Sequence, residues 1–200
     1  LRSPEMQRVT DAGVELTDAS TMPSEETTYR AKWKPNTYTV KYNANGGTGT
    51  IADQKMTYDS PVNLTANVFT RTGYTFLGWS TSSTATSATY SAGGSITISV
   101  NTILYAVWRV NTYTITYNAN GGTGSASQSV DYGVTWTSNN GSGFSRAGHI
   151  LNGWSLTADG EVHYGLGTAQ SVWSTTSDLT LYAVWAIQTY TITYKPGVNG

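Results

Sequence analysis

One phrase of the sequence occurs twice, and this internal repeat constrains the fold more than any other feature. The first copy opens with Thr37–Gly47 (TYTVKYNANGG), passes through Gly73–Trp79 (GYTFLGW) and closes with Leu104–Trp108 (LYAVW). The second copy has matching blocks in the same order: Thr112–Gly122, Gly153–Trp154 and Leu181–Trp185. Corresponding tryptophans recur at a step of about 75 residues, so each repeat has the size of a small domain and not of a short solenoid unit.

The copies define the expected domain organisation. Tyr29–Trp33 aligns with the closing block Leu104–Trp108, and three-residue linkers join each closing block to the next opening block. Such short linkers predict restricted orientations between neighbouring repeats. We expect four segments, as in a window cut from a longer array: 1–34, the C-terminal part of a preceding repeat; 37–108 and 112–185, complete repeats; and 188–200, the opening strand of a following repeat.

The opening block alternates between two kinds of side chain. Tyr38, Val40 and Tyr42 fall on one face of an extended chain, and polar residues fall on the other. This period of two predicts a half-buried strand. The same alternation predicts strands with these inward residues in the later copies: Tyr113, Ile115 and Tyr117, then Tyr190, Ile192 and Tyr194. Asn45-Gly46 and Asn120-Gly121 are expected to supply the positive-φ residues of a turn.

Further strands are predicted in both repeats. We expect strands near 54–58 and 128–132, over 73–79, and over the closing block. In the closing block of the N-terminal fragment, Arg30 and Lys32 stand at the positions of Tyr105 and Val107. The core face of the closing strand is therefore predicted to be the Leu–Ala–Trp face. Residues 61–68 are compatible with a short helical turn. The expected fold is therefore β-rich, between all-β and α+β, with little helix.

The composition excludes several classes of function. The net charge is −1 and only 12% of residues are charged, so nothing predicts binding to nucleic acid or to a charged membrane surface. The sequence contains no run of 18 apolar residues, so membrane insertion within this segment is not predicted. The absence of cysteine excludes disulfides, thiolate nucleophiles and cysteine metal sites.

No catalytic, cofactor-binding or metal-binding residue is predicted, and we expect no enzyme. Asp159, Glu161 and His163 alternate and could place three ligands on one face of a strand, but the first repeat lacks them and a solvated loop is favoured. His149 replaces Tyr74, which predicts a half-buried aromatic role. Nucleophile-elbow and phosphate-loop motifs are missing from the sequence.

Two further features have structural and functional interpretations. The recurring tryptophans could be sugar-stacking platforms, but their positions favour core-filling residues: Trp79, Trp108, Trp154 and Trp185. Lys41 lies near Asn43, as in intramolecular isopeptide crosslinks of some adhesins. Such a crosslink also needs a buried acid, and the second repeat has Thr116 in place of Lys41, so it is not expected.

The order of the three blocks, Y-T-[VI]-x-Y-N-A-N-G-G, R-x-G-Y-x-F-x-G-W and L-Y-A-V-W, resembles the internalin B-type (Listeria–Bacteroides) repeat family of bacterial surface proteins. The resemblance covers about residues 37–108 and 112–185 and the fragments at either end. It implies small, tandem β-grasp-like (ubiquitin-like) domains. It also implies a place in large secreted or wall-anchored proteins, hence an extracellular or cell-surface location.

These observations predict a non-catalytic structural stalk or spacer in a bacterial adhesin-like protein. One alternative is a self-assembling extracellular filament subunit, in which the orphan strand 189–194 completes another copy by strand complementation. A second alternative is a module that binds a glycan or a host protein through exposed Tyr and Thr faces. The expected partners are neighbouring repeats or other copies of the chain, and in the second alternative a host-surface protein or glycan.

Overall fold

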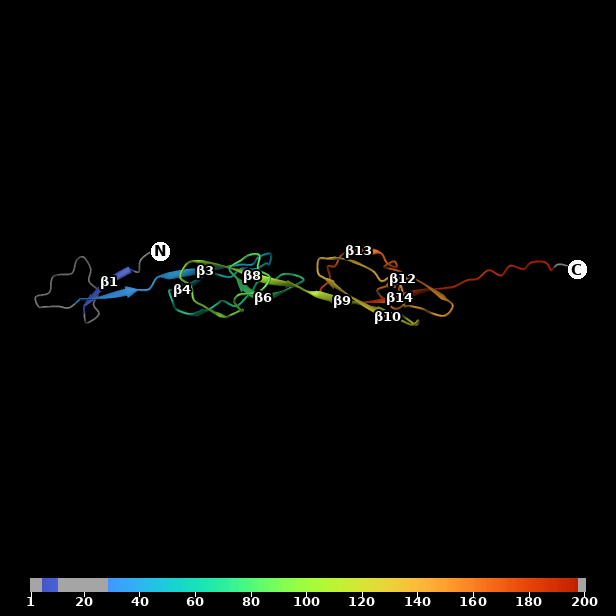
Figure 1. Cartoon of the computed structure of the whole chain (residues 1–200), viewed down its shortest axis with the longest axis horizontal. Coiled ribbons are helices and arrows are strands. Elements are labelled where there is room, and N and C mark those ends of the chain that lie inside the picture. Colours follow the sequence, from blue (N-terminus) through green and yellow to red (C-terminus); the bar gives the residue numbers. More distant parts are fainter. Residues whose placement is uncertain (1–4, 11–28, 198–200) are drawn as a thin grey trace, which may run out of the picture. The chain divides into compact units, whose positions relative to one another are not determined.

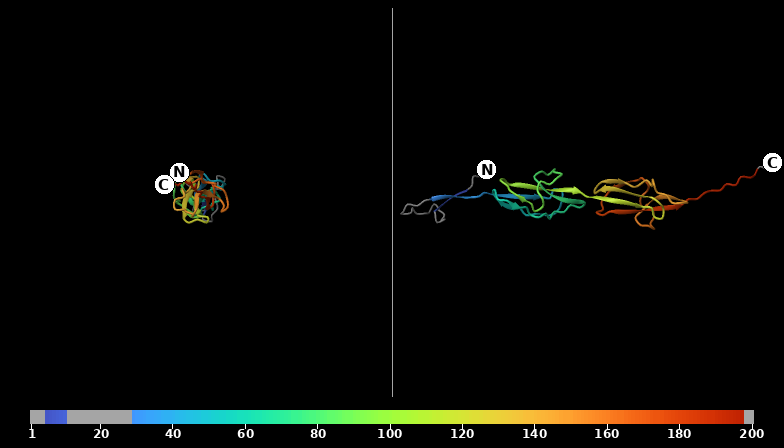
Figure 2. Two further views of the ribbon diagram at one scale, coloured as in Figure 1. Left: turned by 90° about the vertical axis from the view of Figure 1, so that its right-hand side faces the viewer. Right: turned by 60° about the horizontal axis from the view of Figure 1, so that its bottom comes forward.

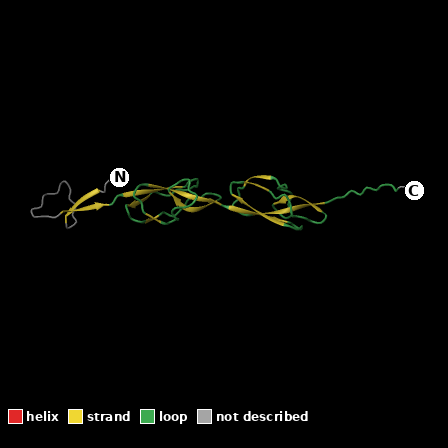
Figure 3. Cartoon of the chain, in the orientation of Figure 1, coloured by secondary structure: helices red, strands yellow, loops and turns green. Residues whose placement is uncertain are grey.

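The computed structural model describes residues 5–10 and 29–197. Every regular element in these residues is a β-strand, and Figure 3 shows strands and loops with no helix among them. The chain forms two compact units. Unit 1 comprises Leu1–Arg71 with Phe76–Arg109, and unit 2 comprises Thr72–Thr75 with Val110–Gly200. The predicted β-rich fold is confirmed, and the described residues contain no helix.

Unit 1 is built around a four-stranded mixed sheet in the order β4-β3-β8-β6. The strands are β3 (Thr37–Asn43), β4 (Gln54–Thr57), β6 (Tyr74–Ser80) and β8 (Thr102–Val110). β3 pairs with β4 antiparallel and with β8 parallel, so the first and last strands of the repeat are neighbours at the sheet centre (Figure 1). A short antiparallel ribbon accompanies the sheet: β5 (Val62–Asn63) and β7 (Ser95–Ile96).

Unit 2 repeats this arrangement with a longer second strand and a longer ribbon. Its sheet has the order β10-β9-β14-β12, and β9 pairs in parallel with β14. The strands are β9 (Thr112–Asn118), β10 (Ser125–Asp131), β12 (His149–Ser155) and β14 (Leu179–Ile187). Its ribbon is β11 (Thr135–Thr137) with β13 (Ala169–Val172). The sequence-coloured ribbons of Figure 2 follow the same strands from two other sides.

Each core lies where the alternation of side chains places it. Val40 of β3 is fully buried, with Tyr38 and Tyr42 packed against the same cluster. Leu104 and Ala106 of β8 are fully buried on that side. In unit 2 the corresponding residues, Ile115, Tyr117, Leu181 and Ala183, are buried with Tyr113 packed beside them. The predicted core faces of the opening and closing strands are confirmed.

The outer face of the closing strand differs from the prediction at one position. Val107 is 1% exposed although it lies on the face expected to tolerate charge. It is not part of the core cluster, and its counterpart Val184 is only half-buried. The Tyr–Val face of β8 is therefore not uniformly open to solvent.

The alternation of inward and outward side chains reverses within the strand that contains each buried tryptophan. Phe76 and Trp79 both pack into the core of unit 1 although strict alternation puts them on opposite faces. The register of β12 on β14 shifts between Leu151 and Gly153, which marks a bulge at the corresponding place in unit 2. In unit 1, Gly78 has φ +142°, and a Cβ on this residue would lie 2.4 Å from the Tyr90 carbonyl oxygen. The bulge turns the tryptophan inward, and only glycine fits beside it.

Three expectations need correction. Residues 61–68 contain β5 and no helical turn, because Val62 and Asn63 pair with β7. The Asn-Gly turns have the predicted positive φ, but β3 and β4 are joined by a loop and not by a two-residue hairpin. Residues 189–194 form no strand, because no described strand pairs with them. Their predicted inward side chains are exposed: Tyr190, Ile192 and Tyr194.

The N-terminal fragment contains the predicted closing strand. β2 (Tyr29–Lys34) pairs antiparallel with β1 (Glu5–Thr10). Trp33 aligns with Trp108 and Trp185, which are partly buried and pack against the cores of the later repeats, yet Trp33 is 57% exposed. Among the residues described at this end of the chain, the β1–β2 ribbon has no second layer to cover this ring, so the predicted core face is not formed by them.

Candidate functional site

The most recurrent polar cluster of the chain surrounds the Asn-Gly turn after each opening strand. In unit 1, Asn45 adopts φ +48°, and Asn43 Oδ1 accepts a hydrogen bond from its backbone N–H. Asn45 Nδ2 donates to the carbonyl oxygens of Ser83 and Ala106, both at 2.9 Å. The side chain thus joins the turn to a long loop and to β8. In unit 2 the equivalent donor reaches equivalent acceptors: Asn120, Ala158 and Ala183.

The closing tryptophan completes this cluster. Trp108 Nε1 donates to the carbonyl oxygen of Ala44 at 2.9 Å. A Cβ on Gly47 would lie 2.8 Å from Trp108 Cζ2 and 2.9 Å from the Thr70 carbonyl oxygen, so the turn and the indole are in close contact. A Cβ on Gly46 would meet the Arg71 guanidinium carbon at 3.4 Å. The three sequence blocks therefore converge on one turn, and the polar groups that recur in both repeats serve the fold. The counterparts in unit 2 are Trp185, Ala119, Gly122 and Arg146.

The second tryptophan of each repeat lies in the core. Trp79 is fully buried and contacts the rings of Tyr42 and Phe76, each with centroids 4.9 Å away. Its indole nitrogen has no hydrogen-bond partner among the described residues, whereas Trp154 Nε1 donates to the Asn139 carbonyl oxygen at 2.8 Å. The core interpretation of the recurring tryptophans is confirmed for these two rings.

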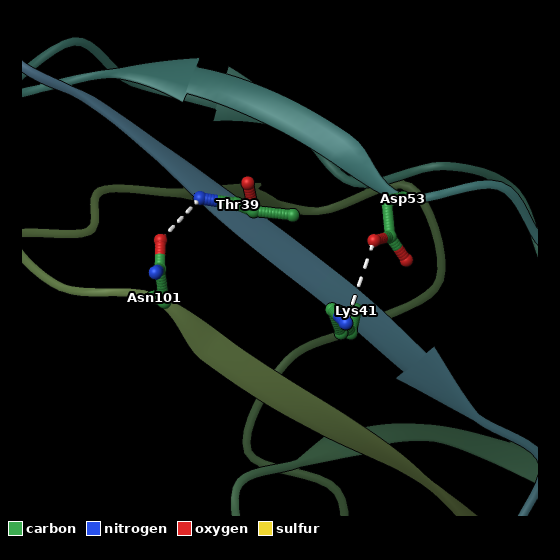
Figure 4. Close-up of polar contacts among 4 residues, drawn as sticks. All are labelled: Thr39, Lys41, Asp53 and Asn101. Atoms are coloured by element: carbon green, nitrogen blue, oxygen red, sulfur yellow. Dashed lines mark hydrogen bonds and ion pairs between the residues drawn. The ribbon is translucent and has the colours of Figure 1, made fainter.

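Two polar contacts involve β3. In the first, Asn101, just before β8, accepts a hydrogen bond from the Thr39 backbone N–H at 2.9 Å (Figure 4), and Asp178 accepts one from the Thr114 N–H in the same way in unit 2. Lys41 Nζ lies 3.8 Å from Asp53 (Figure 4), and both side chains are more than half exposed. An exposed pair of this kind contributes little stability. It also lacks the buried acid that an isopeptide crosslink requires.

The candidate metal ligands do not form a site. Asp159, Glu161 and His163 are exposed and lie outside the strands, and within the described residues no three His, Cys, Asp or Glu side chains are grouped to hold a metal ion. His163 packs edge-on against the ring of Tyr164, with centroids 4.5 Å apart. His149 is half-buried, as predicted, and its Nδ1 lies 2.8 Å from the Ala147 carbonyl oxygen.

Unit 2 has an open groove that the sequence did not indicate. Its volume is about 520 Å³, and it lies between β10, β11 and the turn that joins them. Trp136 is the aromatic residue of its lining, and this ring is half-buried. The complete lining is Gln128, Ser129, Val130, Asp131, Val134, Thr135, Trp136 and Thr137. The sequence signal that could have indicated this groove is the exchange of Val62 in the first repeat for Trp136 in the second.

No helix in the described ranges combines the length and apolarity needed to cross a bilayer.

Two curated proteins of Evansella cellulosilytica are similar to the chain. One, named "Putative Gly-rich membrane protein", is 28% identical over 87% of this chain and 20% of its own length. The other, named "Putative membrane protein", is 30% identical over 86% of this chain and 24% of its own length. The chain thus spans about a fifth to a quarter of these relatives. No solved structure matches the chain.

The family comparison covers both repeats. The model of the Listeria-Bacteroides repeat domain matches residues 38–107 and again residues 113–184. These two tandem matches contain the opening strand, the Asn-Gly turn and nearly all of the closing block in each copy, and together they exceed half of the sequence. The chain belongs to the Listeria-Bacteroides repeat domain family.

Proposed function

We propose that the chain is a non-catalytic structural stalk, a spacer of tandem repeats in a bacterial cell-surface or secreted adhesin-like protein. One observation carries the proposal: the first and last strands of each repeat are parallel neighbours in the centre of its sheet. Tension along the chain pulls the start of β3 and the end of β8 in opposite directions along their common axis. The hydrogen bonds between them then share the load in shear, which suits a segment that transmits force.

The use of the recurrent polar groups supports a role without chemistry. Asn45 and Trp108 donate their side-chain hydrogen bonds to backbone carbonyl oxygens, and Asn120 and Trp185 do the same in unit 2. A catalytic constellation needs a nucleophile, base or metal aimed at a substrate. Here the residues that recur are those that hold the first and last strands of each unit together.

The strand order supports a finer structural assignment. In each unit the second, first, last and third long strands follow one another across the sheet, with the first and last parallel. This is the arrangement expected of a β-grasp-like domain, here without a helix in the described residues. We further propose, from the resemblance of the three sequence blocks, that the repeats are of the internalin B type of the family. The similarity to relatives named as membrane proteins supports a location at the bacterial surface. Neighbouring repeats or further copies of the chain are the partners that we propose.

Single-molecule stretching of the 200-residue chain between its ends tests the stalk role. Each complete repeat should unfold in a separate event that releases about 25 nm of chain, since roughly 70 residues extend at ~3.5 Å each. Two such events at similar, high force support a load-bearing spacer. Smooth extension without force peaks contradicts it. Trp108→Ala is the matched variant: it should remove the event of unit 1 and leave that of unit 2.

A further inference from the structure

The ribbon beside the sheet has a different chemistry in the two repeats. Gln54 Nε2 donates to the Asn63 carbonyl oxygen in unit 1, and Gln128 Nε2 donates to the Thr137 carbonyl oxygen in unit 2. These equivalent bonds align the two ribbons residue by residue. The residue before each acceptor is Val62 in unit 1 and Trp136 in unit 2. The second repeat thus has a large aromatic ring where the first has a small aliphatic side chain.

The Trp136 ring is held in place by other aromatic rings. Its centroid lies 5.1 Å from that of Tyr164 and 5.8 Å from that of Trp173, with interplanar angles of 71° and 77°. Trp173 is 4% exposed, whereas Trp136 is half-buried and lines the groove. Edge-to-face packing of this kind fixes the orientation of a ring. The groove therefore has a rigid aromatic wall before any ligand arrives.

The polar lining is rich in hydrogen-bond acceptors. In unit 1, Gln54 Oε1 accepts hydrogen bonds from Tyr42 and Thr65. Gln128 Oε1 accepts none from the described residues. Asp131 replaces Thr57 of unit 1; it lies on the opposite face of β10 from Gln128, where its Oδ1 accepts a hydrogen bond from Thr112 Oγ1.

We propose that the groove of the second repeat binds a neutral saccharide, with one face of a sugar ring stacked on Trp136 and a hydroxyl group donating to Gln128 Oε1. A sugar ring presents weakly positive C–H groups on its face and hydroxyl donors at its edge. These match the negative face of an indole and the unfilled acceptor of Gln128 in the same lining. The groove volume of about 520 Å³ falls within the range of roughly 300–1,000 Å³ typical of small-ligand sites.

The charge of the lining decides against anionic ligands. Asp131 is the one charged residue among the lining residues, and neither lysine nor arginine is present there. A phosphate, a nucleic acid or an acidic sugar would face a carboxylate with no cation to balance it. A neutral, hydroxyl-rich ligand meets no such repulsion. This role goes beyond the stalk and can fail without affecting it.

Titration of the 200-residue chain with neutral oligosaccharides tests the proposal. The probes are cellohexaose, chitohexaose and mannohexaose, with oligogalacturonate as the acidic comparison, and the readouts are tryptophan fluorescence and calorimetry. At least one neutral probe should bind saturably, and oligogalacturonate should not. Trp136→Val, which installs the first-repeat residue, should weaken this binding about tenfold or more.

Matched variants separate binding from folding. Ile150→Thr also exchanges an exposed residue of unit 2 for its first-repeat counterpart, Thr75, and should leave binding unchanged. Should Trp136→Val lower the melting temperature, Gln128→Met provides a second groove variant, which removes the Oε1 acceptor and should also weaken binding. Absence of saturable binding by all three neutral probes overturns the proposal. So does neutral-probe binding that survives both groove substitutions.

Discussion

The indole Nε1 of Trp108 donates a hydrogen bond to the carbonyl oxygen of Ala44, 64 residues earlier in the chain, at 2.9 Å. The same bond joins Trp185 to Ala119 in the second unit at 2.8 Å. It connects the closing strand of each repeat to the loop that follows its opening strand. The Asn-Ala-Asn-Gly-Gly block and the closing Leu-Tyr-Ala-Val-Trp block recur together because each supplies one partner of this contact.

Removal of the indole N–H should destabilise unit 1 modestly. Trp108→Phe keeps an aromatic ring but leaves the Ala44 carbonyl oxygen without its donor, at an expected cost of about 1–2 kcal/mol. Denaturant unfolding followed for unit 1 measures the change. Trp33→Phe is the control, because Trp33 is 57% exposed and should tolerate the exchange. Equal stabilities of the two variants would contradict the importance of the bond.

The Asn45 side chain should be sensitive to loss of its amide donor. Asn45→Asp replaces Nδ2, which lies 2.9 Å from two carbonyl oxygens, with an oxygen that repels both. We expect a loss of about 2–3 kcal/mol in the free energy of unfolding. Asn45→Gly keeps the positive φ and removes the side chain without adding repulsion, so it should cost less. The order of the two melting temperatures is the measurement, and a more stable aspartate variant would refute this interpretation.

The close approach of Gly47 to the tryptophan predicts a steric effect. Gly47→Ala would place a Cβ 2.8 Å from Trp108 Cζ2 and 2.9 Å from the Thr70 carbonyl oxygen, so the turn must shift. Overpacking of this kind typically costs about 1–3 kcal/mol. Gly93→Ala has no atom within 4 Å of the new Cβ and serves as a control for conformational strain alone, since its φ is +69°. Thermal unfolding should show the larger loss for Gly47→Ala together with altered fluorescence of Trp108.

Alkaline pH should destabilise unit 2 through Tyr117. Burial raises the pKa of the Tyr117 phenol above its ordinary value of 10.0, and the hydrogen bond with the Asn139 backbone opposes the shift in part. The unfolded chain therefore releases this proton more readily than the folded one. The stability that results is complete below about pH 10 and is lost as the pH rises through the folded pKa. Denaturant midpoints measured against pH should show this loss, and Tyr117→Phe should remove that component. Identical alkaline profiles would contradict it.

Much of each sheet could be predicted from the sequence. The alternation of Tyr38, Val40 and Tyr42 sets the buried face of β3, and comparison of repeat copies sets the core face of β8, because burial of one face enforces a period of two. The reversal of side-chain alternation at Gly78 could not be predicted from the sequence in this way. A bulge changes which residue points inward, and its position depends on the backbone of a neighbouring strand.

The groove of unit 2 illustrates what local patterns omit. Its residues come from β10, β11 and the turn between them, and its free acceptor is identified only once the hydrogen bonds of Gln128 are known. The favoured interpretation of Asp159, Glu161 and His163 is confirmed. Their alternation was compatible with a shared strand face, but these residues belong to an exposed loop, where alternation imposes no common direction.

The direction of pulling tests the load-bearing role of the parallel pair most directly. Lys41 and Ile103 are exposed partners on β3 and β8, and the chain has no cysteine, so Lys41→Cys with Ile103→Cys gives two unique attachment points. Force between them separates the strands one hydrogen bond at a time, whereas force between the chain ends shears the whole ladder. We predict a rupture force for unit 1 that is several-fold higher when the chain is pulled from its ends. Equal forces in the two geometries would contradict a stalk built on this strand pair.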